Sequence, residues 1–410
     1  MKAWQFMLMA AAVSVAAPKC ARAQEAQQPQ KLTLAQALDM AAKQNLDLIA
    51  ARAQRAVAAA NVRAAGERPN PTANANVLRD DPHEGWWLDV PIELGSKRKQ
   101  RITLARAQGV LTDDDISALE RLTRQNVRGA FFNLALARST TQEKSDALKL
   151  AQRLENIAQS RFDAGDVPEL EVEQAKLDAA QAQADYQVAQ QEEKVALSAF
   201  DALLNEPPGT DWALVTPLET MPSEGQLSDL LTRAGNANPD LQKIAQQEKI
   251  QQSQRALLRA QRIPNLTLSA GLDSNAPHNF RYGPRSQASM EIPIFMRNQG
   301  EIAESSATLI ALEDQAAATR RAVDGRVEQA YYELDAREAQ AKLYNETLVP
   351  AAAHLESMAE ESYQAGKANI LSVLDAQRNV QQVRLAYLQS VFAVQQAFAQ
   401  LEETVGAPLD

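Results

Sequence analysis

The sequence predicts a mainly α-helical protein with a small β part, built twice from one plan. Aromatic residues make up only 5% of the 410 residues and glycine contributes 15, and chains of this kind that are rich in Ala, Gln, Glu and Leu favour long helices. An internal repeat is the second indication: the stretch from Ser160 to Ala189 returns at Glu361 to Ser390, with Gly165 matched by Gly366. The third is a switch from helical to two-residue periodicity at the same place in each half.

The first 23 residues have the pattern of a cleaved secretory signal peptide. Lys2 precedes an apolar run from Phe6 to Ala17, and a small-x-small exit site ends at Ala23. The only cysteine, Cys20, lies inside this segment, so the mature chain is expected to form no disulfide. Lipidation of Cys20 is the alternative, and Lys19 directly before it disfavours that modification.

Charge and hydropathy exclude two classes of protein. The formal net charge of −10 becomes −13 when Lys2, Lys19 and Arg22 leave with the signal peptide, and the sequence shows no evident basic patch. These features argue against a nucleic-acid partner. After Ala23 no apolar run reaches the ~20 residues of a transmembrane helix, so any membrane span must consist of strands.

The sequence of the first half predicts a helix, two strands, a long helix and a shorter helix, in that order. A helix from Thr33 to Glu67 is ended by the prolines at 69 and 71, and strands follow at about 71–79 and 86–94. No proline interrupts the helical pattern of residues 97–163, which predicts a rod of ~100 Å. After the turn at Gly165, a helix at 168–204 is about half as long.

The second half repeats this plan after a linker at 205–225. The predicted elements are a helix at 226–262, strands at about 264–273 and 286–295, a long helix at 299–364 and a helix at 369–405. Pro350 is expected to kink the long helix. Two apolar stripes on the last helix predict two neighbours, as for a stave in a helical barrel, although an ordinary bundle core explains one stripe equally well.

The strands set a requirement for assembly. Four strands cannot close a membrane barrel, which needs at least about 8, and an open sheet in lipid would leave edge amides unpaired. Several copies of the chain must therefore combine their strands, giving eight for two copies or twelve for three. Trp86 and Trp87 fit an aromatic girdle at the membrane interface, or equally a locally packed pair.

Together with "RFDAGD" from Arg161 and "YQAGKANILSVLDAQ" from Tyr363, this order of elements resembles the TolC-like outer membrane efflux factors over nearly the whole mature chain. "VPIELGSKRKQRITLARA" from Val90 and "IPIFMRNQGEIAES" from Ile292 are similar to the cobalt-zinc-cadmium (CzcC-like) heavy-metal type. The resemblance implies a homotrimer whose twelve strands form an outer membrane β-barrel, continuous with a periplasmic α-helical barrel. Residues 205–225 would then lie in an equatorial girdle.

The resemblance further implies that the chain is the outer membrane subunit of a tripartite efflux system. There it would be a passive exit duct for divalent heavy-metal cations. Its implied partners are outer membrane lipid, a periplasmic adaptor protein and an inner membrane transporter of the RND type. Two alternatives remain open: an exit duct of the same fold for drugs or for type I secretion, and a periplasmic adaptor or scaffold of helical hairpins. A diffusion porin is disfavoured because its chain should supply at least about 8 strands.

The resemblance also implies roles for particular residues. The glycine turns would be hairpin tips that contact the adaptor, a role carried over to Gly165, Asp166, Val167, Gly366, Lys367 and Ala368. A constriction of the lumen would involve Glu171, Gln174, Ser372 and Asp375. Ser372 stands where other members carry an acid, and Ala368 replaces a basic residue that helps to lock the closed tip in some members. Solvated helix faces are the alternative for these carboxylates.

Catalytic and cofactor motifs are absent from the sequence. The mature chain has three histidines, no cysteine, no zinc-ligand spacing, no nucleophile motif and no phosphate-binding glycine loop. We therefore expect neither enzymatic activity nor a cofactor. His83 and His278 each follow a proline in a predicted outer loop, which raises the hypothesis that they bind departing metal ions weakly.

Overall fold

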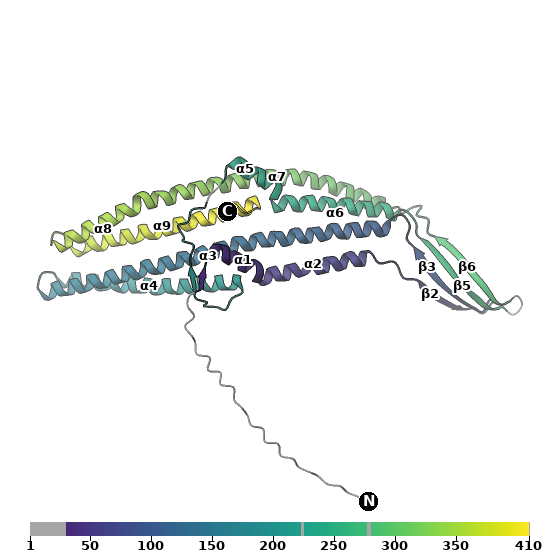
Figure 1. Cartoon of the computed structure of the whole chain (residues 1–410), viewed down its shortest axis with the longest axis horizontal. Coiled ribbons are helices and arrows are strands. Elements are labelled where there is room, and N and C mark those ends of the chain that lie inside the picture. Colours follow the sequence, from purple (N-terminus) through teal and green to yellow (C-terminus); the bar gives the residue numbers. More distant parts are fainter. Residues whose placement is uncertain (1–29, 223–224, 277–279, 410) are drawn as a thin grey trace, which may run out of the picture.

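A computed structural model describes residues 30–222, 225–276 and 280–409. The chain is a long rod of helices that carries a four-stranded sheet at one end and two helical hairpins at the other (Figure 1). None of the helices in the described part of the chain combines the length and the hydropathy that a membrane span requires.

Both halves of the chain contribute matching elements. The first half comprises β1 (Gln30–Leu32), α1 (Leu34–Gln44), α2 (Leu46–Ala65), β2 (Thr72–Val77), β3 (Glu84–Ile92), α3 (Lys97–Asp163), α4 (Glu169–Leu204) and β4 (Trp212–Leu214). The second half comprises α5 (Leu227–Ala237), α6 (Pro239–Gln261), β5 (Leu266–Ala276), β6 (Phe280–Met290), α7 (Gln299–Leu343), a π-helical turn (Tyr344–Leu348), α8 (Val349–Gln364) and α9 (Ile370–Val405).

Short helices flank the long ones. Towards the sheet, α2, α3, α6 and α7 lie side by side, and towards the tips the order is α4, α3, α9 and α8 (Figure 1). The helix α9 packs against both α3 and the α7–α8 rod, as its two apolar stripes predict. Each chain is thus a curved wall about one helix thick, with α2 and α4 along one side and α7 and α8 along the other.

Two helices predicted as continuous are each broken at an asparagine. The expected helix from Thr33 to Glu67 divides at Asn45, and the one at 226–262 divides at Asn238, because both asparagines have extended backbone with ψ of 124° and 128°. Each is buried and caps the following helix with its side-chain oxygen, while its Nδ2 donates to a distant carbonyl: Asn45 to Leu203 at 3.0 Å, and Asn238 to Thr404 at 2.8 Å. These bonds fasten the breaks to the ends of α4 and α9.

The long second helix contains a π-helical turn at residues 344–348, directly before Pro350. Pro350 has no amide hydrogen to donate and lies in the first turn of α8. The wider π-helical turn makes room for the proline ring, and α7 continues through this turn into α8.

The described residues form two sheets, and these correct the strand predictions. β1 pairs in parallel with β4, a contact of three residues on each side that the sequence analysis did not predict. The larger sheet is antiparallel with the order β2-β3-β5-β6. Its last strand spans 280–290 rather than 286–295, because Met290 pairs with Leu266, the first residue of β5, and the ladder ends there.

The main core lies at mid-rod, where the two repeats meet. Phe131 contacts Phe132 and Phe200 edge-to-face at 5.4 and 5.9 Å, and Phe200 contacts Trp212 at 6.3 Å. Such aromatic pairs contribute about 0.5–1.5 kcal/mol each beyond their burial. The buried Asp201 carboxylate accepts a 2.8 Å bond from the Trp212 indole nitrogen, which fastens the segment after α4 to this core.

Candidate functional site

The two hairpin tips have the same turn chemistry. Gly165 has φ of +82° and Gly366 has φ of +68°, a left-handed conformation that glycine adopts without steric cost. In the first turn the Asp166 amide donates to the Arg161 carbonyl at 2.9 Å, and in the second the Lys367 amide donates to the Ser362 carbonyl at 2.9 Å. Both are Schellman caps, which end one helix and reverse the chain into the next.

A small apolar cluster joins the two hairpins close to these turns. Its members are Leu154, Ala158, Val172, Ala175, Tyr363, Ile370, Val373 and Leu374. The Arg161 guanidinium lies 4.8 Å above the Tyr363 ring, a cation–π contact from the first hairpin to the second. The tips of one chain therefore form a single packed unit.

The residues predicted to contact an adaptor lie at the end of this packed unit. Gly165, Asp166, Gly366 and Lys367 are exposed, and Val167 and Ala368 are half-buried. This placement makes the first four accessible to a partner. The turns are also helix caps, so the glycines serve the fold independently of any such contact.

The four constriction candidates differ in their surroundings. Glu171 and Gln174 are half-buried on α4, whereas the Asp375 side chain is 72% exposed, with a carboxylate oxygen 4.0 Å from Arg378. The Ser372 amide and hydroxyl donate to the Asn369 side chain at 3.1 and 3.0 Å, as part of the N-terminal cap of α9. Glu171 and Gln174 are on α4, and Ser372 and Asp375 are on α9.

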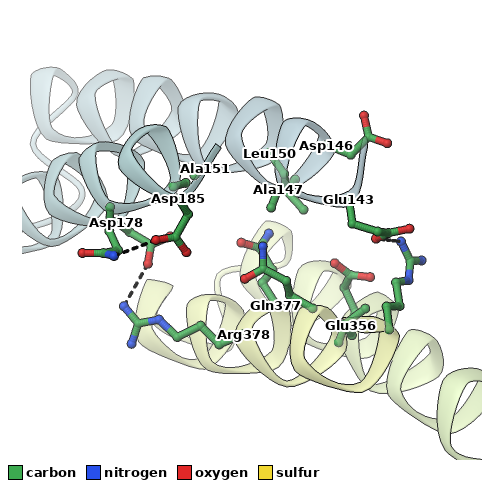
Figure 2. Close-up of a pocket in the computed structure, with 15 residues that line it drawn as sticks. Glu143, Asp146, Ala147, Leu150, Ala151, Asp178, Asp185, Glu356, Gln377 and Arg378 are labelled. Carbon is green, nitrogen blue, oxygen red and sulfur yellow. Dashed lines mark hydrogen bonds and ion pairs between the residues drawn. The ribbon is translucent and has the colours of Figure 1, made fainter. Parts of the chain in front are cut away.

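A cavity of about 280 Å³ separates the hairpins further from the tips, lined by carboxylates of three helices (Figure 2). Figure 2 shows Arg378 reaching from α9 to Asp178 on α4, a pair with an N–O distance of 2.8 Å. Arg384 pairs with Glu143 on α3 at 3.4 Å. Burial raises the pKa of Glu356, and the Arg384 charge opposes this shift.

The sequence analysis did not identify this ionic contact between the hairpins. Asp178 and Arg378 are 200 residues apart, which is close to the repeat offset. Their near-equivalent positions in the two repeats could have indicated this contact, because repeats that pack side by side bring matching positions together.

The larger sheet has one apolar and one polar face. Trp86 lies on the apolar face with Leu272 opposite it, and their exposed fractions are 59% and 53%. On the other face the Asn74 amide donates to Asp89 at 2.8 Å, and the Arg285 guanidinium lies 4.5 Å above the Trp87 ring. The adjacent tryptophans therefore point to opposite faces and do not form a packed pair. A solvated globular sheet would not expose its apolar face in this way.

The hypothesis that His83 and His278 bind metal ions concerns the end of the sheet that is remote from the helices. His83 Nε2 lies 3.1 Å from an Asp81 oxygen, and His278 lies outside the described residues. In the described part of the chain, no three His, Cys, Asp or Glu side chains converge as metal ligands.

A repeated helical wall that ends in a small antiparallel sheet is also the fold of CusC, whose crystal structures concern transmembrane channel formation. The chain belongs to the outer membrane efflux protein family, whose sequence profile matches residues 37–206 and 230–407. These two segments correspond to the two repeats.

Similar proteins support this assignment. The cobalt-zinc-cadmium resistance protein CzcC of Cupriavidus metallidurans is 27% identical over 390 residues, which cover 92% of this chain and 90% of that protein. A membrane protein from Pseudomonas aeruginosa has a TM-score of 0.75 at 18% identity, covering 91% of this chain and 93% of that one. CusC also has a TM-score of 0.75, at 19% identity and 92% coverage of both chains. At these identities the solved structures show the shared fold.

Replacing Gly366 with alanine tests the tip geometry. Gly366→Ala should lower the free energy of local opening of the tip by about 1–2 kcal/mol, because a Cβ disfavours positive φ. Hydrogen exchange of the amides around residue 366 measures this opening. The matched control is Gly325→Ala in α7, where the added Cβ has open space and should stabilise the helix by about 0.5–1 kcal/mol. If the two substitutions had equal effects, the left-handed conformation assigned to Gly366 would be contradicted.

A pH dependence follows from the raised pKa of Glu356. The folded state binds this proton more tightly than the unfolded state, so stability falls as pH rises above the ordinary glutamate value of 4.5. Glu356→Gln should therefore raise the thermal unfolding midpoint at pH 7, and this gain should disappear at pH 4. The exposed Glu346→Gln is the control and should show no such pH-dependent gain. A gain for Glu356→Gln that is equal at both pH values would refute the interpretation.

Proposed function

We propose that three copies of this chain form a passive exit duct in the outer membrane, through which divalent heavy-metal cations leave a tripartite efflux system. The sheets would span the outer membrane, and the helical walls would continue the duct into the periplasm. A periplasmic adaptor and an inner membrane transporter of the RND type would deliver the substrate.

The observation that carries this proposal is the open, two-faced sheet. Within the described residues, β2 and β6 each have a strand partner on one side only. An open edge in lipid costs several kcal/mol for each unpaired amide, so the edge strands need partners from other copies. Eight strands from two copies would make a barrel filled by its own side chains, whereas twelve strands from three copies leave room for a lumen.

Exposed apolar rows on the lateral helices support the same ring. On α4 the large side chains at 170, 177, 188 and 195 follow one line, with exposed fractions of 65%, 72%, 57% and 71%. The angle of 100° per residue keeps these four side chains on one side of α4, and Val188 and Val195 also line a groove bordered by α3. On the other side of the wall, Leu355 and Met358 of α8 are 48% and 53% exposed. In a closed ring, the α4 row of one copy would cover α8 of the next.

The tips would face the adaptor. Six turns around one opening would present the exposed Gly165, Asp166, Gly366 and Lys367 to it. Glu171 and Asp375, with Gln174 and Ser372 beside them, would line the narrowing of the lumen and favour cations over anions.

Heavy-metal cations are proposed as the substrate because the relative CzcC is described as a cobalt-zinc-cadmium resistance protein and covers nearly the whole chain. The sequence shows no phosphate-binding loop, so the energy for export would come from the transporter. A duct for hydrophobic drugs is the competing function of the same fold.

The assembly is tested by placing charge on the α4 row. Leu177→Asp combined with Val195→Asp should convert the detergent-extracted trimer into monomers, because each carboxylate would be desolvated between two copies. Light scattering coupled to size exclusion measures the mass. Ser198→Asp, an exposed position off the row, is the matched control and should remain trimeric. A stable trimer of the double variant would disprove this interface, and recovery of the unaltered chain in the soluble periplasm would disprove the duct.

The substrate is tested by gene deletion. Deletion should lower the tolerated concentration of zinc, cadmium, cobalt or nickel more than that of hydrophobic drugs, and the intact gene should restore it. Growth inhibition across a metal and drug series measures the effect. Greater sensitisation to hydrophobic drugs would support the competing function instead.

A further inference from the structure

Four segments connect the sheet to the helices and lie at one level of the molecule. We call residues 63–69, 93–101, 259–265 and 291–299 together the junction collar. Hydrogen bonds tie the segments to one another: Arg98 donates to the Gly66 carbonyl at 2.5 Å, Lys97 to the Asn265 side chain at 2.5 Å, and the Asn298 amide to the Gln261 side chain at 3.4 Å. Figure 1 shows all four connections at the base of the sheet.

The junction collar is strongly basic in a chain whose net charge is −10. It contains nine Lys or Arg residues and three acids, a local net charge of +6. One of the acids, Glu93, is paired with Arg101. The exposed cations of the collar are Arg63, Arg68, Arg98, Lys99, Arg259, Arg262 and Arg297. This corrects the expectation from the sequence that the chain has no basic patch.

An exposed apolar segment accompanies these charges. The collar residues Ile292, Ile294, Phe295 and Met296 have exposed fractions of 70%, 60%, 87% and 82%. Phe295 and Met296 are the two most exposed large apolar side chains in the described part of the chain. Nε of Arg297 donates to the carbonyls of Pro293 and Ile294 at 3.1 Å each, which holds the segment in a compact turn.

We infer that the junction collar binds anionic phospholipids of the inner leaflet of the outer membrane, with residues 292–296 inserted at the boundary between headgroups and acyl chains. The inference rests on the proposed function, which places the sheet across the membrane and its base at that leaflet. Guanidinium groups bind phosphate oxygens in bidentate fashion, and exposed apolar side chains next to cations are typical of segments at lipid interfaces.

Charge favours lipid over a second copy of the chain as the occupant of this surface. A neighbouring collar carries the same +6, so close contact between collars would bring like charges together. An anionic lipid headgroup instead supplies the opposite charge. The apolar segment and the cations then share one ligand, whose phosphate and acyl chains match both.

Removing collar charges tests the electrostatic part of the inference. Arg68→Gln, Lys99→Gln and Arg262→Gln together should weaken binding of phosphatidylglycerol to the purified trimer roughly a hundredfold. Binding of phosphatidylcholine should change little. Native mass spectrometry of the trimer titrated with each lipid measures both. The control removes three exposed charges elsewhere, with Lys194→Gln, Arg321→Gln and Lys342→Gln, and should retain wild-type binding. Equal phosphatidylglycerol binding by both triple variants would overturn the inference.

A depth measurement tests the apolar segment. Met296→Cys in the mature chain, labelled with an environment-sensitive fluorophore and reconstituted into vesicles, should be quenched by lipids that carry a nitroxide near the headgroup. Leu122→Cys on α3 is the matched control, because it is 47% exposed and lies in the helical rod, away from the lateral helices proposed to face the next copy. No quenching at 296 in an intact trimer would show that another copy covers the segment, and would refute lipid insertion there. A chain that forms no membrane-inserted trimer would refute the proposed function itself.

Discussion

The requirement that every backbone amide in lipid be hydrogen-bonded is the constraint on which the proposed membrane-spanning sheet depends. The larger sheet of the protein exposes apolar side chains such as Trp86 and Leu272 on one face and carries the Asn74–Asp89 contact on the other. Among the residues that the structure describes, its outer strands β2 and β6 are paired on one side only. A single copy therefore cannot satisfy its own backbone in a membrane. The same incompleteness recurs in the helical wall, where the α4 row is apolar and uncovered. The sheet and the helices thus both support the proposed assembly of several copies.

Contacts from both repeats stabilise the curved helical wall along its length. Asn45 and Asn238 interrupt the short helices at equivalent places and bond to the ends of α4 and α9. Mid-rod, the aromatic contacts around Phe200 and the Asp201–Trp212 bond fix the segment that follows α4. Towards the tips the packing is less apolar, and the Asp178–Arg378 and Glu143–Arg384 pairs beside a cavity join the hairpins. Partly exposed ion pairs contribute little to stability, so these two pairs add less to the stability of the wall than the mid-rod core does.

Charge is distributed along the rod in a way that total composition conceals. The chain is acidic overall, but its junction collar is basic and lies beside the most exposed apolar segment of the described residues. Carboxylates gather instead around the cavity between the hairpins, where burial raises the pKa of Glu356. The proposed duct thus presents cations to lipid phosphates at one level and carboxylates near the opening for its proposed cation substrate at another.

Local pattern determined much of this structure, and long-range contact determined the rest. The uninterrupted run at 97–163, the glycines at 165 and 366 and the alternation around Trp86 are properties of neighbouring residues, so the long helix, the reversing turns and the strands were readable from the sequence. The breaks at Asn45 and Asn238 were not, because the helical periodicity continues through them and the deciding hydrogen bonds come from residues more than 150 positions away. The end of β6 depends on where β5 begins, and the three-residue pairing of β1 with β4 is too short to leave a pattern. The ion pairs between the hairpins and the junction collar arise only when the fold brings distant segments to one level, since charges that are sparse along the chain interact only once they are close in space.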